Sequence, residues 1–328
     1  MSRTVLRTFW VCVCCFVCML VHSQQVDYSV PYVQQESDCG FVKISTENDW
    51  VAMPLVIRSK NTLQWQTNRI LAMSPDGKDL AYLSLRDGMT NIFIKDLSRP
   101  LVSRQRTNRT SVQDFSYSPD GKFICFTEKI SQETTQLFTT DSKQGSVCRQ
   151  ITSGAQDYSP LYSPNMENIY FTRLDGQGCA IWGYDTSHNV LSTYTMGMNP
   201  CPDGNTILYV ARTGANENGE IWKVNFETGT NECVVSAPNQ SFYSPLLSPN
   251  GKYLLLVGET LIKSGNISYR NTDVYVCDVD GSNLRQLTYH AADDLSPVWS
   301  MDGKYIYFIS QRGSSDAVPN IWRMNFAY

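Results

Sequence analysis

The sequence Ser74-Pro75-Asp76-Gly77 is the first of six related tetrapeptides that recur along the chain. Proline fixes φ at the second position, aspartate or asparagine can bond to its own backbone, and glycine accepts a positive φ at the fourth. The tetrapeptide therefore predicts a tight turn between two antiparallel strands. The later copies are Ser118-Pro119-Asp120-Gly121, Ser163-Pro164-Asn165-Met166, Cys201-Pro202-Asp203-Gly204, Ser248-Pro249-Asn250-Gly251 and Ser300-Met301-Asp302-Gly303.

A short apolar run follows each turn, as expected for a strand that is covered on both faces. These runs occupy residues 80–83, 124–127, 169–172, 207–210, 254–257 and 306–309. A second motif keeps the same spacing: an aliphatic-aromatic pair with Asp or Asn three positions after the aromatic residue. Its copies begin at Ile92, Leu137, Ile181, Ile221, Val274 and Ile321. Two motifs that recur in phase indicate six copies of one structural unit.

Each unit is long enough for four antiparallel strands, which make one blade of a β-propeller. A blade cannot bury both of its faces alone, so the blades must close into a ring. The sixth repeat ends on its third strand, near Trp322. We therefore expect an all-β, six-bladed propeller whose ring is closed by an N-terminal strand. The segment 54–59 has the position of such a strand.

The first 23 residues have the features of a signal peptide. Arg3 and Arg7 precede an apolar run over residues 9–21, and the small residue Ser23 follows it. We expect cleavage before Gln24 and a periplasmic or secreted location. The rest of the chain then divides into an N-terminal arm at residues 24–53 and the propeller at residues 54–328.

The Ser-Pro-Asp-Gly turn, the strand after it and the aliphatic-aromatic strand resemble the WD40-like (PD40) repeats of TolB-type propellers. The resemblance covers residues 54–328. TolB is a periplasmic protein of the bacterial envelope that binds partner proteins and catalyses no reaction, and it carries an α/β domain before its propeller. Too few residues precede the first turn here to form that domain, so we expect a propeller-only relative.

The resemblance implies an exported, non-catalytic binding protein that recognises a protein or peptide of the envelope on one face of the propeller. We expect a monomer, and leave a glycan partner and peripheral association with a membrane open. Nucleic acid is excluded as a partner, because the formal net charge is −4 and no run of Lys or Arg forms a basic patch.

The residues expected to bind this partner lie where the innermost strands begin, at one mouth of the central tunnel. Positions six residues before the turns, and their neighbours, form an acidic and partly aromatic rim. A second interpretation is that these carboxylates only accept hydrogen bonds from the neighbouring blade, as buried polar groups usually do. The predicted rim residues are Asn68, Asp114, Asp157, Phe242, Asp293 and Asp294.

An alternative is a carbohydrate-active enzyme, a polysaccharide lyase or glycosidase, with Asp157 and Asp294 as acids in the tunnel. A third possibility is a purely structural module. The G-x-S-x-G motif of an α/β-hydrolase does not occur, which argues against a serine peptidase. Oligogalacturonate lyases bind a metal through clustered histidines, whereas only His188 and His290 follow the signal peptide. We therefore expect neither a metal nor a cofactor.

Overall fold

The computed structural model describes residues 28–59, 64–143, 147–175, 178–215, 217–264 and 267–327. Strands dominate this part of the chain, and its two helices are short 3-10 turns, η1 (Gln34–Glu36) and η2 (Glu47–Asp49). No helix in the described residues is both long enough and apolar enough to cross a membrane. The predicted signal peptide lies outside these residues.

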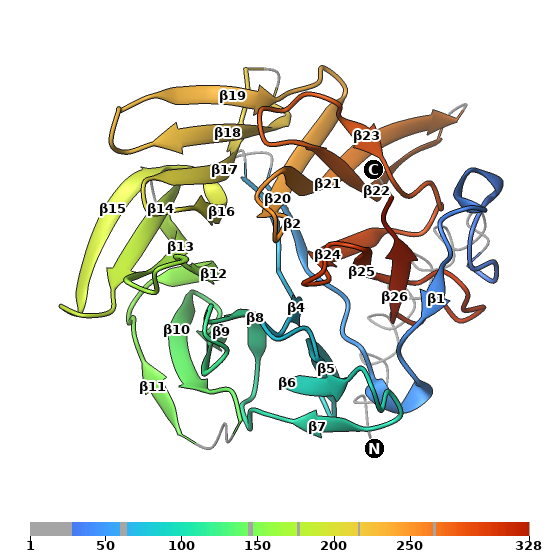
Figure 1. Cartoon of the computed structure of the whole chain (residues 1–328), viewed down its shortest axis with the longest axis horizontal. Helices are drawn as coiled ribbons and strands as arrows, with labels where there is room; N and C mark the ends of the chain where they lie inside the picture. Colours follow the sequence, from blue (N-terminus) through green and yellow to red (C-terminus); the bar gives the residue numbers. More distant parts are fainter. Residues whose placement is uncertain are drawn as a thin grey trace, which may run out of the picture.

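Most strands form antiparallel groups of consecutive strands around a central axis (Figure 1). We number the groups as blades in chain order and count the two halves of an eight-stranded sheet separately, because one parallel pair, Thr135 with Gln156, joins them. The predicted all-β propeller class is confirmed by this arrangement. Blade 1 is β4 (Leu71–Met73), β5 (Asp79–Arg86), β6 (Met89–Asp96) and β7 (Ser103–Gln105); blade 2 is β8 (Val112–Tyr117), β9 (Phe123–Ser131), β10 (Thr134–Asp141) and β11 (Cys148–Gln150); blade 3 is β12 (Gln156–Tyr162), β13 (Asn168–Asp175), β14 (Gly178–Asp185) and β15 (Val190–Met196); blade 4 is β16 (Met198–Asp203), β17 (Ile207–Thr213), β18 (Gly219–Asn225) and β19 (Asn231–Val235); blade 5 is β20 (Gln240–Leu247), β21 (Tyr253–Ser264), β22 (Ile267–Asp278) and β23 (Arg285–Gln286).

Blade 6 combines the two ends of the chain. Its strands β24 (Asp294–Trp299), β25 (Tyr305–Ser310) and β26 (Asn320–Asn325) take a fourth partner, β1 (Val42–Lys43), which pairs antiparallel with β26. Ser45 strengthens the junction, because its hydroxyl donates to Asn320 Oδ1 over 2.9 Å. In Figure 1 the blue β1 lies beside the dark red β26.

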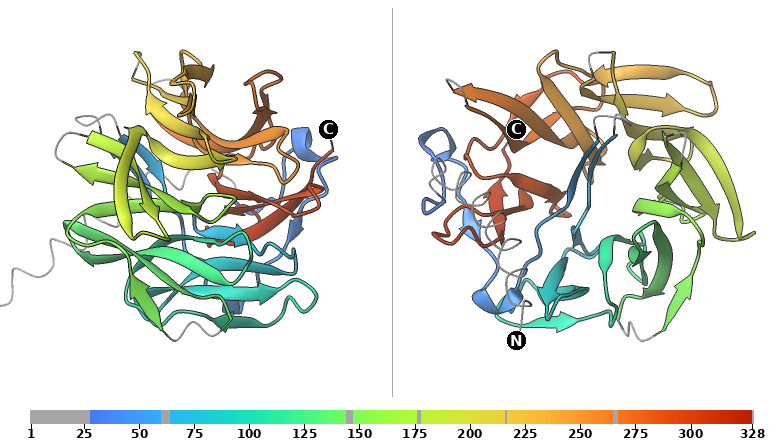
Figure 2. Two further views of the ribbon diagram at one scale, coloured as in Figure 1. Left: turned by 60° about the vertical axis from the view of Figure 1, so that its left-hand side comes forward. Right: turned by 180° about the vertical axis from the view of Figure 1, so that it is seen from behind.

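The prediction that segment 54–59 closes the ring was wrong. Strand β2 (Val56–Ser59) pairs with β3 (Gln64–Thr67) in a hairpin of its own, and β3 lies against β16, β17 and β20. The hairpin crosses the centre of the ring (Figure 2, right). A local hairpin needs only a short connection, and the edge of β26 is already occupied by β1.

The predicted turns form as expected in five of the six repeats. In blade 1 the Ser74 hydroxyl donates to Asp76 over 2.7 Å and accepts the Asp79 amide over 2.9 Å, while Gly77 has φ of 71°. Equivalent contacts are made by Ser118, Ser163, Ser248 and Ser300. The shared serine therefore holds both sides of each turn.

The fourth tetrapeptide is the exception. Cys201 lies inside β16 opposite Tyr209, and the turn follows Asp203, which pairs with Ile207. Asp203 is therefore the structural counterpart of the turn serines, two residues later than the sequence pattern indicated. Cys201 Sγ instead accepts the Leu247 amide of blade 5 over 3.2 Å.

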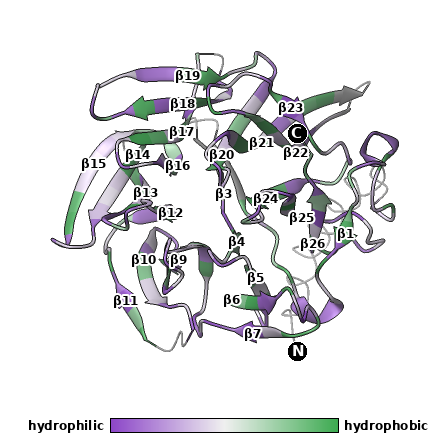
Figure 3. Ribbon diagram, viewed as in Figure 1, coloured by the Kyte–Doolittle hydropathy of each residue, from purple (hydrophilic) through white to green (hydrophobic). Residues whose placement is uncertain are grey.

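The outer strands of blades 1, 2 and 5 are short and polar. Strands β7, β11 and β23 have two or three residues each, and all three contain an Arg next to a Gln. Figure 3 shows β7 as hydrophilic. Short charged edge strands discourage pairing with another molecule's sheet, which suits a ring whose blades end in water.

A buried ion pair fastens the N-terminal arm to blade 1. The Asp49 carboxylate lies 2.8 Å from Lys95 Nζ, and both side chains are almost completely buried. The same carboxylate accepts the Tyr82 hydroxyl over 2.8 Å and the Ser103 hydroxyl over 2.6 Å. Asp49 thus satisfies three polar groups on successive strands of this blade.

Replacing Asp49 with Ala should lower the free energy of unfolding by about 3 to 5 kcal/mol, because a buried Lys95 ammonium loses its partner. Urea unfolding of the purified protein measures this loss. The matched control is Glu47→Ala, an exposed position in the same 3-10 helix, which should leave stability nearly unchanged. Equal stability of the two variants would show that Asp49 does not anchor the arm.

Candidate functional site

The predicted rim residues are mostly buried. Asp293 is partly exposed, whereas the other five have at most 2% of their surface accessible. The residues belong to separate clusters: Asp114 and Asp157 lie near each other in blades 2 and 3, and Asp293 and Asp294 lie in blade 6. No single acidic rim is formed by them.

Each of these side chains contacts other parts of the protein. Asp157 binds Arg173 through two hydrogen bonds of 2.7 and 2.9 Å. Asp114 accepts the Thr127 hydroxyl and, over 2.7 Å, the Ser159 amide of the next blade. The Ser159 contact joins blades 2 and 3, as the second interpretation of the rim expects, whereas the Arg173 and Thr127 contacts lie within one blade.

The two uncharged rim residues also face protein. Asn68 Nδ2 donates to the Gln113 carbonyl over 3.0 Å. Phe242 packs edge-on against Tyr275, with 5.4 Å between ring centroids. The hairpin of β2 and β3 directly precedes β4 and contacts β16 and β20, so it lies at the end of the tunnel where the inner strands begin. That end is therefore partly covered by the chain itself.

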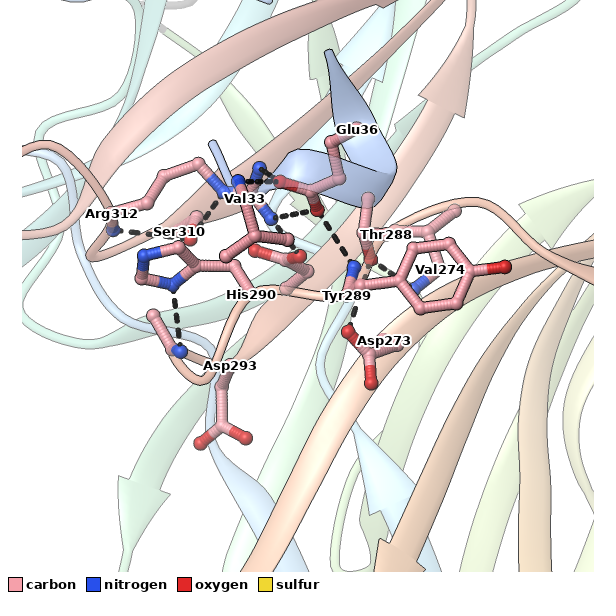
Figure 4. Close-up of polar contacts among 12 residues, drawn as sticks. Val33, Glu36, Asp273, Val274, Thr288, Tyr289, His290, Asp293, Ser310 and Arg312 are labelled. Atoms are coloured by element: carbon pink, nitrogen blue, oxygen red, sulfur yellow. Dashed lines mark hydrogen bonds and ion pairs between the residues drawn. The ribbon is translucent and has the colours of Figure 1, made fainter. Parts of the chain in front are cut away.

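A buried charged cluster joins the arm to blades 5 and 6 (Figure 4). Arg312 donates to both carboxylate oxygens of Glu36 over 3.0 and 3.1 Å and also to Asp294. Glu36 in turn accepts the Tyr289 amide over 2.7 Å. All three charged side chains are inaccessible to solvent. The cluster therefore positions the arm rather than meeting a ligand.

Asp273 adds a third carboxyl group to this cluster. Burial, and after it the charge of Asp294, raises the pKa of Asp273 to about 9. Thr288 donates to its Oδ1 over 3.3 Å, and Asn271 donates to its Oδ2 over 2.9 Å. One guanidinium cannot neutralise three carboxylates, so Asp273 holds a proton at neutral pH.

The open cavity lies at the other end of the tunnel, where the Ser-Pro-Asp-Gly turns meet. It has a volume of about 530 Å³, and all six blades contribute to its wall. Most described lining residues are apolar, and Arg69 is the charged one among them. Its rim and wall include Pro75, Pro119, Pro164, Pro202, Pro249, Tyr117, Tyr162, Trp299 and Met301.

The rim predicted from the sequence lies where the inner strands begin, whereas this cavity lies at their other end. The turn prolines were a usable signal, since five of the six tetrapeptides carry Pro at their second position. In a closed ring these prolines must gather around the axis. A volume of this size is typical of small-ligand sites.

Bulges in the inner strands shape the tunnel between the two ends. Ser159, Asn199, Ser244 and Ser296 each precede a proline and have φ between 51° and 53°. A non-glycine residue in this region costs roughly 1 to 3 kcal/mol and needs support from its surroundings. Contacts between blades supply the support: the Asn199 amide group donates to Ser159 Oγ over 2.9 Å, and Ser296 Oγ accepts the Ile70 amide over 2.8 Å.

The seven cysteines of the described chain are free thiols. Within the same residues, no group of three or more His, Cys, Asp or Glu side chains is arranged to hold a metal ion. The central cavity, with Arg69 in its wall, is the candidate site for ligand recognition.

The family model for the TolB beta propeller domain, PD40, matches residues 58–217 and 195–327. This chain belongs to that family. An uncharacterized protein of Agrobacterium fabrum is 23% identical over 265 residues, which cover 76% of this chain and 88% of that protein.

Solved structures share the PD40 fold at low identity. A candidate TolB of Agrobacterium tumefaciens has a TM-score of 0.58 and 19% identity, with 81% of this chain and 93% of that chain covered. TolB of Acinetobacter baumannii has a TM-score of 0.57 and 20% identity over 75% of this chain, which spans only 62% of that TolB. An oligogalacturonate lyase of Vibrio parahaemolyticus has a TM-score of 0.54 and 12% identity, over 89% of this chain and 99% of the lyase.

Stability should depend on pH through Asp273. The ordinary pKa of Asp is about 3.9, so from about pH 4 to 9 the folded state holds a proton that the unfolded state has released. The stabilisation is complete below about pH 4 and is lost as pH rises toward the pKa of the folded state.

We predict that the wild type loses about 3 kcal/mol of unfolding free energy between about pH 6 and 8 through this group, and that Asp273→Asn loses clearly less. Urea unfolding at both pH values measures the difference. Asp280→Asn is the control, because this exposed carboxyl has a lowered pKa and does not titrate in the window. A variant curve parallel to the wild type would contradict the assignment of the proton to Asp273.

Proposed function

We propose that this PD40 protein is an exported, non-catalytic binding protein that holds a protein or peptide partner at the turn end of its propeller. The supporting observation is the composition of the central cavity. Its described lining is mostly proline, aromatic and aliphatic, with one charged residue. Such a surface suits recognition of an apolar segment, whereas general acid-base catalysis needs a titratable pair facing the substrate.

The acids named for the carbohydrate-enzyme alternative do not line this cavity. Asp157 is bound by Arg173 and Asp294 by Arg312, both out of contact with solvent. Neither carboxylate is therefore placed to donate or accept a proton from a substrate in the cavity. We accordingly favour the binding function, in line with the TolB-type family.

The location of the partner can be tested with two methionines of similar exposure. Met301 lines the cavity and is 43% exposed, while Met89 is 41% exposed. Met89 begins β6 at its hairpin with β5, and antiparallel order places that hairpin at the opposite end from the turns. Each methionine is replaced in turn by the photo-reactive benzoylphenylalanine, and the protein is irradiated in envelope extract of its host.

A discrete cross-linked adduct from position 301, and none from position 89, is the expected result. Mass spectrometry then identifies the partner. An adduct only from position 89 would place the partner at the end where the inner strands begin and contradict the location proposed here. Absence of a discrete adduct from both positions would contradict the binding function itself.

A further inference from the structure

Arg69 differs from its counterparts in the other five repeats. It lies five residues before the turn serine of blade 1, and the equivalent positions hold no charged residue: Gln113, Tyr158, Met198, Tyr243 and Leu295. The repeat therefore does not require arginine here. A long charged side chain at one of six otherwise uncharged positions needs a reason specific to blade 1.

The backbone at Arg69 is held by both neighbouring blades. The Arg69 carbonyl accepts the Phe115 amide of blade 2 over 3.1 Å. The next residue, Ile70, donates its amide to Ser296 Oγ of blade 6 over 2.8 Å. These contacts fix the start of the side chain beside the tunnel axis.

The guanidinium group of Arg69 reaches across the tunnel to blade 5. Its Nη2 donates to the Pro245 carbonyl over 3.3 Å. Only 6% of the residue is exposed, yet Nη1 has no hydrogen-bond partner in the described part of the chain. Arg69 nevertheless lines the open cavity, and Nη1 is the terminal nitrogen of this side chain that keeps unused hydrogens for a group entering from the turn end.

No carboxylate of the described residues forms an ion pair with Arg69. The carboxyl group of Asp114 acts on it from a distance, but Asp114 already accepts the Thr127 hydroxyl and the Ser159 amide. Burial lowers the pKa of Arg69, which reflects the cost of keeping this cation out of water. By contrast, the buried Arg312 and the partly buried Arg173 each bind a carboxylate directly. Among the described residues, Arg69 is a buried cation without a paired carboxylate.

The cavity walls narrow the choice of anion. A guanidinium binds carboxylate and phosphate well, because its N–H groups match their oxygens. Here a single cation with one free terminal nitrogen faces an otherwise uncharged, largely apolar lining. One cation balances a monoanion and leaves a dianionic phosphate unneutralised, and prolines and aromatic rings favour an apolar body. A carboxylate on an apolar group fits both requirements.

We propose that the central cavity binds the carboxylate of an apolar ligand, with Arg69 Nη1 donating to it at the cavity floor. The inference rests on the proposed function, since it concerns the same cavity and names the chemistry recognised there. The carboxylate can belong to a free small acid or to the C-terminus of a peptide that ends in apolar residues. The test has one arm for each source.

Isothermal titration compares acids with their neutral amides on the full mature chain. The first arm uses phenylbutyrate and phenylbutyramide; the second uses acetyl-Leu-Phe with a free or an amidated C-terminus. A hydrogen bond to a charged group should make the acid bind roughly 10-fold to 100-fold more tightly than the amide. Tight binding of phenylbutyrate supports a small free acid as the ligand. Tight binding of acetyl-Leu-Phe with a free C-terminus, but not of phenylbutyrate, supports a peptide C-terminus.

Two variants assign the effect to Arg69. Arg69→Met keeps an unbranched stem without the guanidinium group and should abolish the preference for the acid. Arg104→Met removes the same charge from an exposed position on β7 and should keep the preference. If Arg69→Met does not fold, as judged by circular dichroism, the comparison of acid and amide on the wild type still decides the question.

Equal binding of acid and amide by the wild type, or no binding of either acid, would overturn the inference. An acid preference that survives in Arg69→Met would overturn the role of Arg69. These outcomes are independent of the cross-linking result. Binding of phenylbutyrate without an adduct at position 301 would support the carboxylate site and contradict the protein partner. An adduct at position 301 without binding of either acid would support the partner and contradict the carboxylate site.

Discussion

Closure between the first and last blades is the constraint on which the rest of the molecule depends. Each blade covers its faces with its neighbours, so blade 1 must pack against blade 6. The N-terminal arm spans this junction: Asp49 binds Lys95 of blade 1, Glu36 binds Arg312 of blade 6, and β1 pairs with β26. Near the axis the Ile70 amide and Ser296 Oγ join the same two blades.

The closed ring determines what each end of the tunnel can do. Where the inner strands begin, the carboxylates accept hydrogen bonds across blades and the hairpin of β2 and β3 lies over the centre. At the turn end, six connections converge without a covering segment from the described chain and leave the cavity. The contact between Ile70 and Ser296 at the closure also fixes the backbone of the preceding residue, Arg69, whose side chain lines that cavity.

The fold could be predicted largely because its repeat is local. Turn residues and apolar runs act over a few positions, so the tetrapeptides and strands were readable one repeat at a time. The closing strand was not readable, because Val42–Lys43 is too short to have a pattern and is defined by its contact with β26. The position of the fourth turn was predicted wrongly, because Cys201-Pro202-Asp203-Gly204 matches the tetrapeptide in sequence. In the structure a shorter loop places the turn after Asp203.

The site was harder to predict than the fold, because burial depends on residues that are distant in sequence. Asp294 stands near the start of its strand as expected, but Glu36 and Arg312 come from an arm and a loop with no repeat pattern. Arg69 could have been singled out from the sequence alone, as the charged residue in a column of uncharged counterparts. That Nη1 has no partner among the described residues could not be predicted, because it depends on how the assembled blades surround the tunnel.

Recognition in the central cavity depends most directly on Arg69 acting as an anion receptor, and bromide tests this without any assumed ligand. Crystals of the mature protein are soaked in sodium bromide, and anomalous scattering locates the bound ions. We expect a bromide peak in the central cavity at hydrogen-bond distance from Arg69 Nη1. Bromide peaks at surface arginines such as Arg104, with none in the cavity, would contradict it.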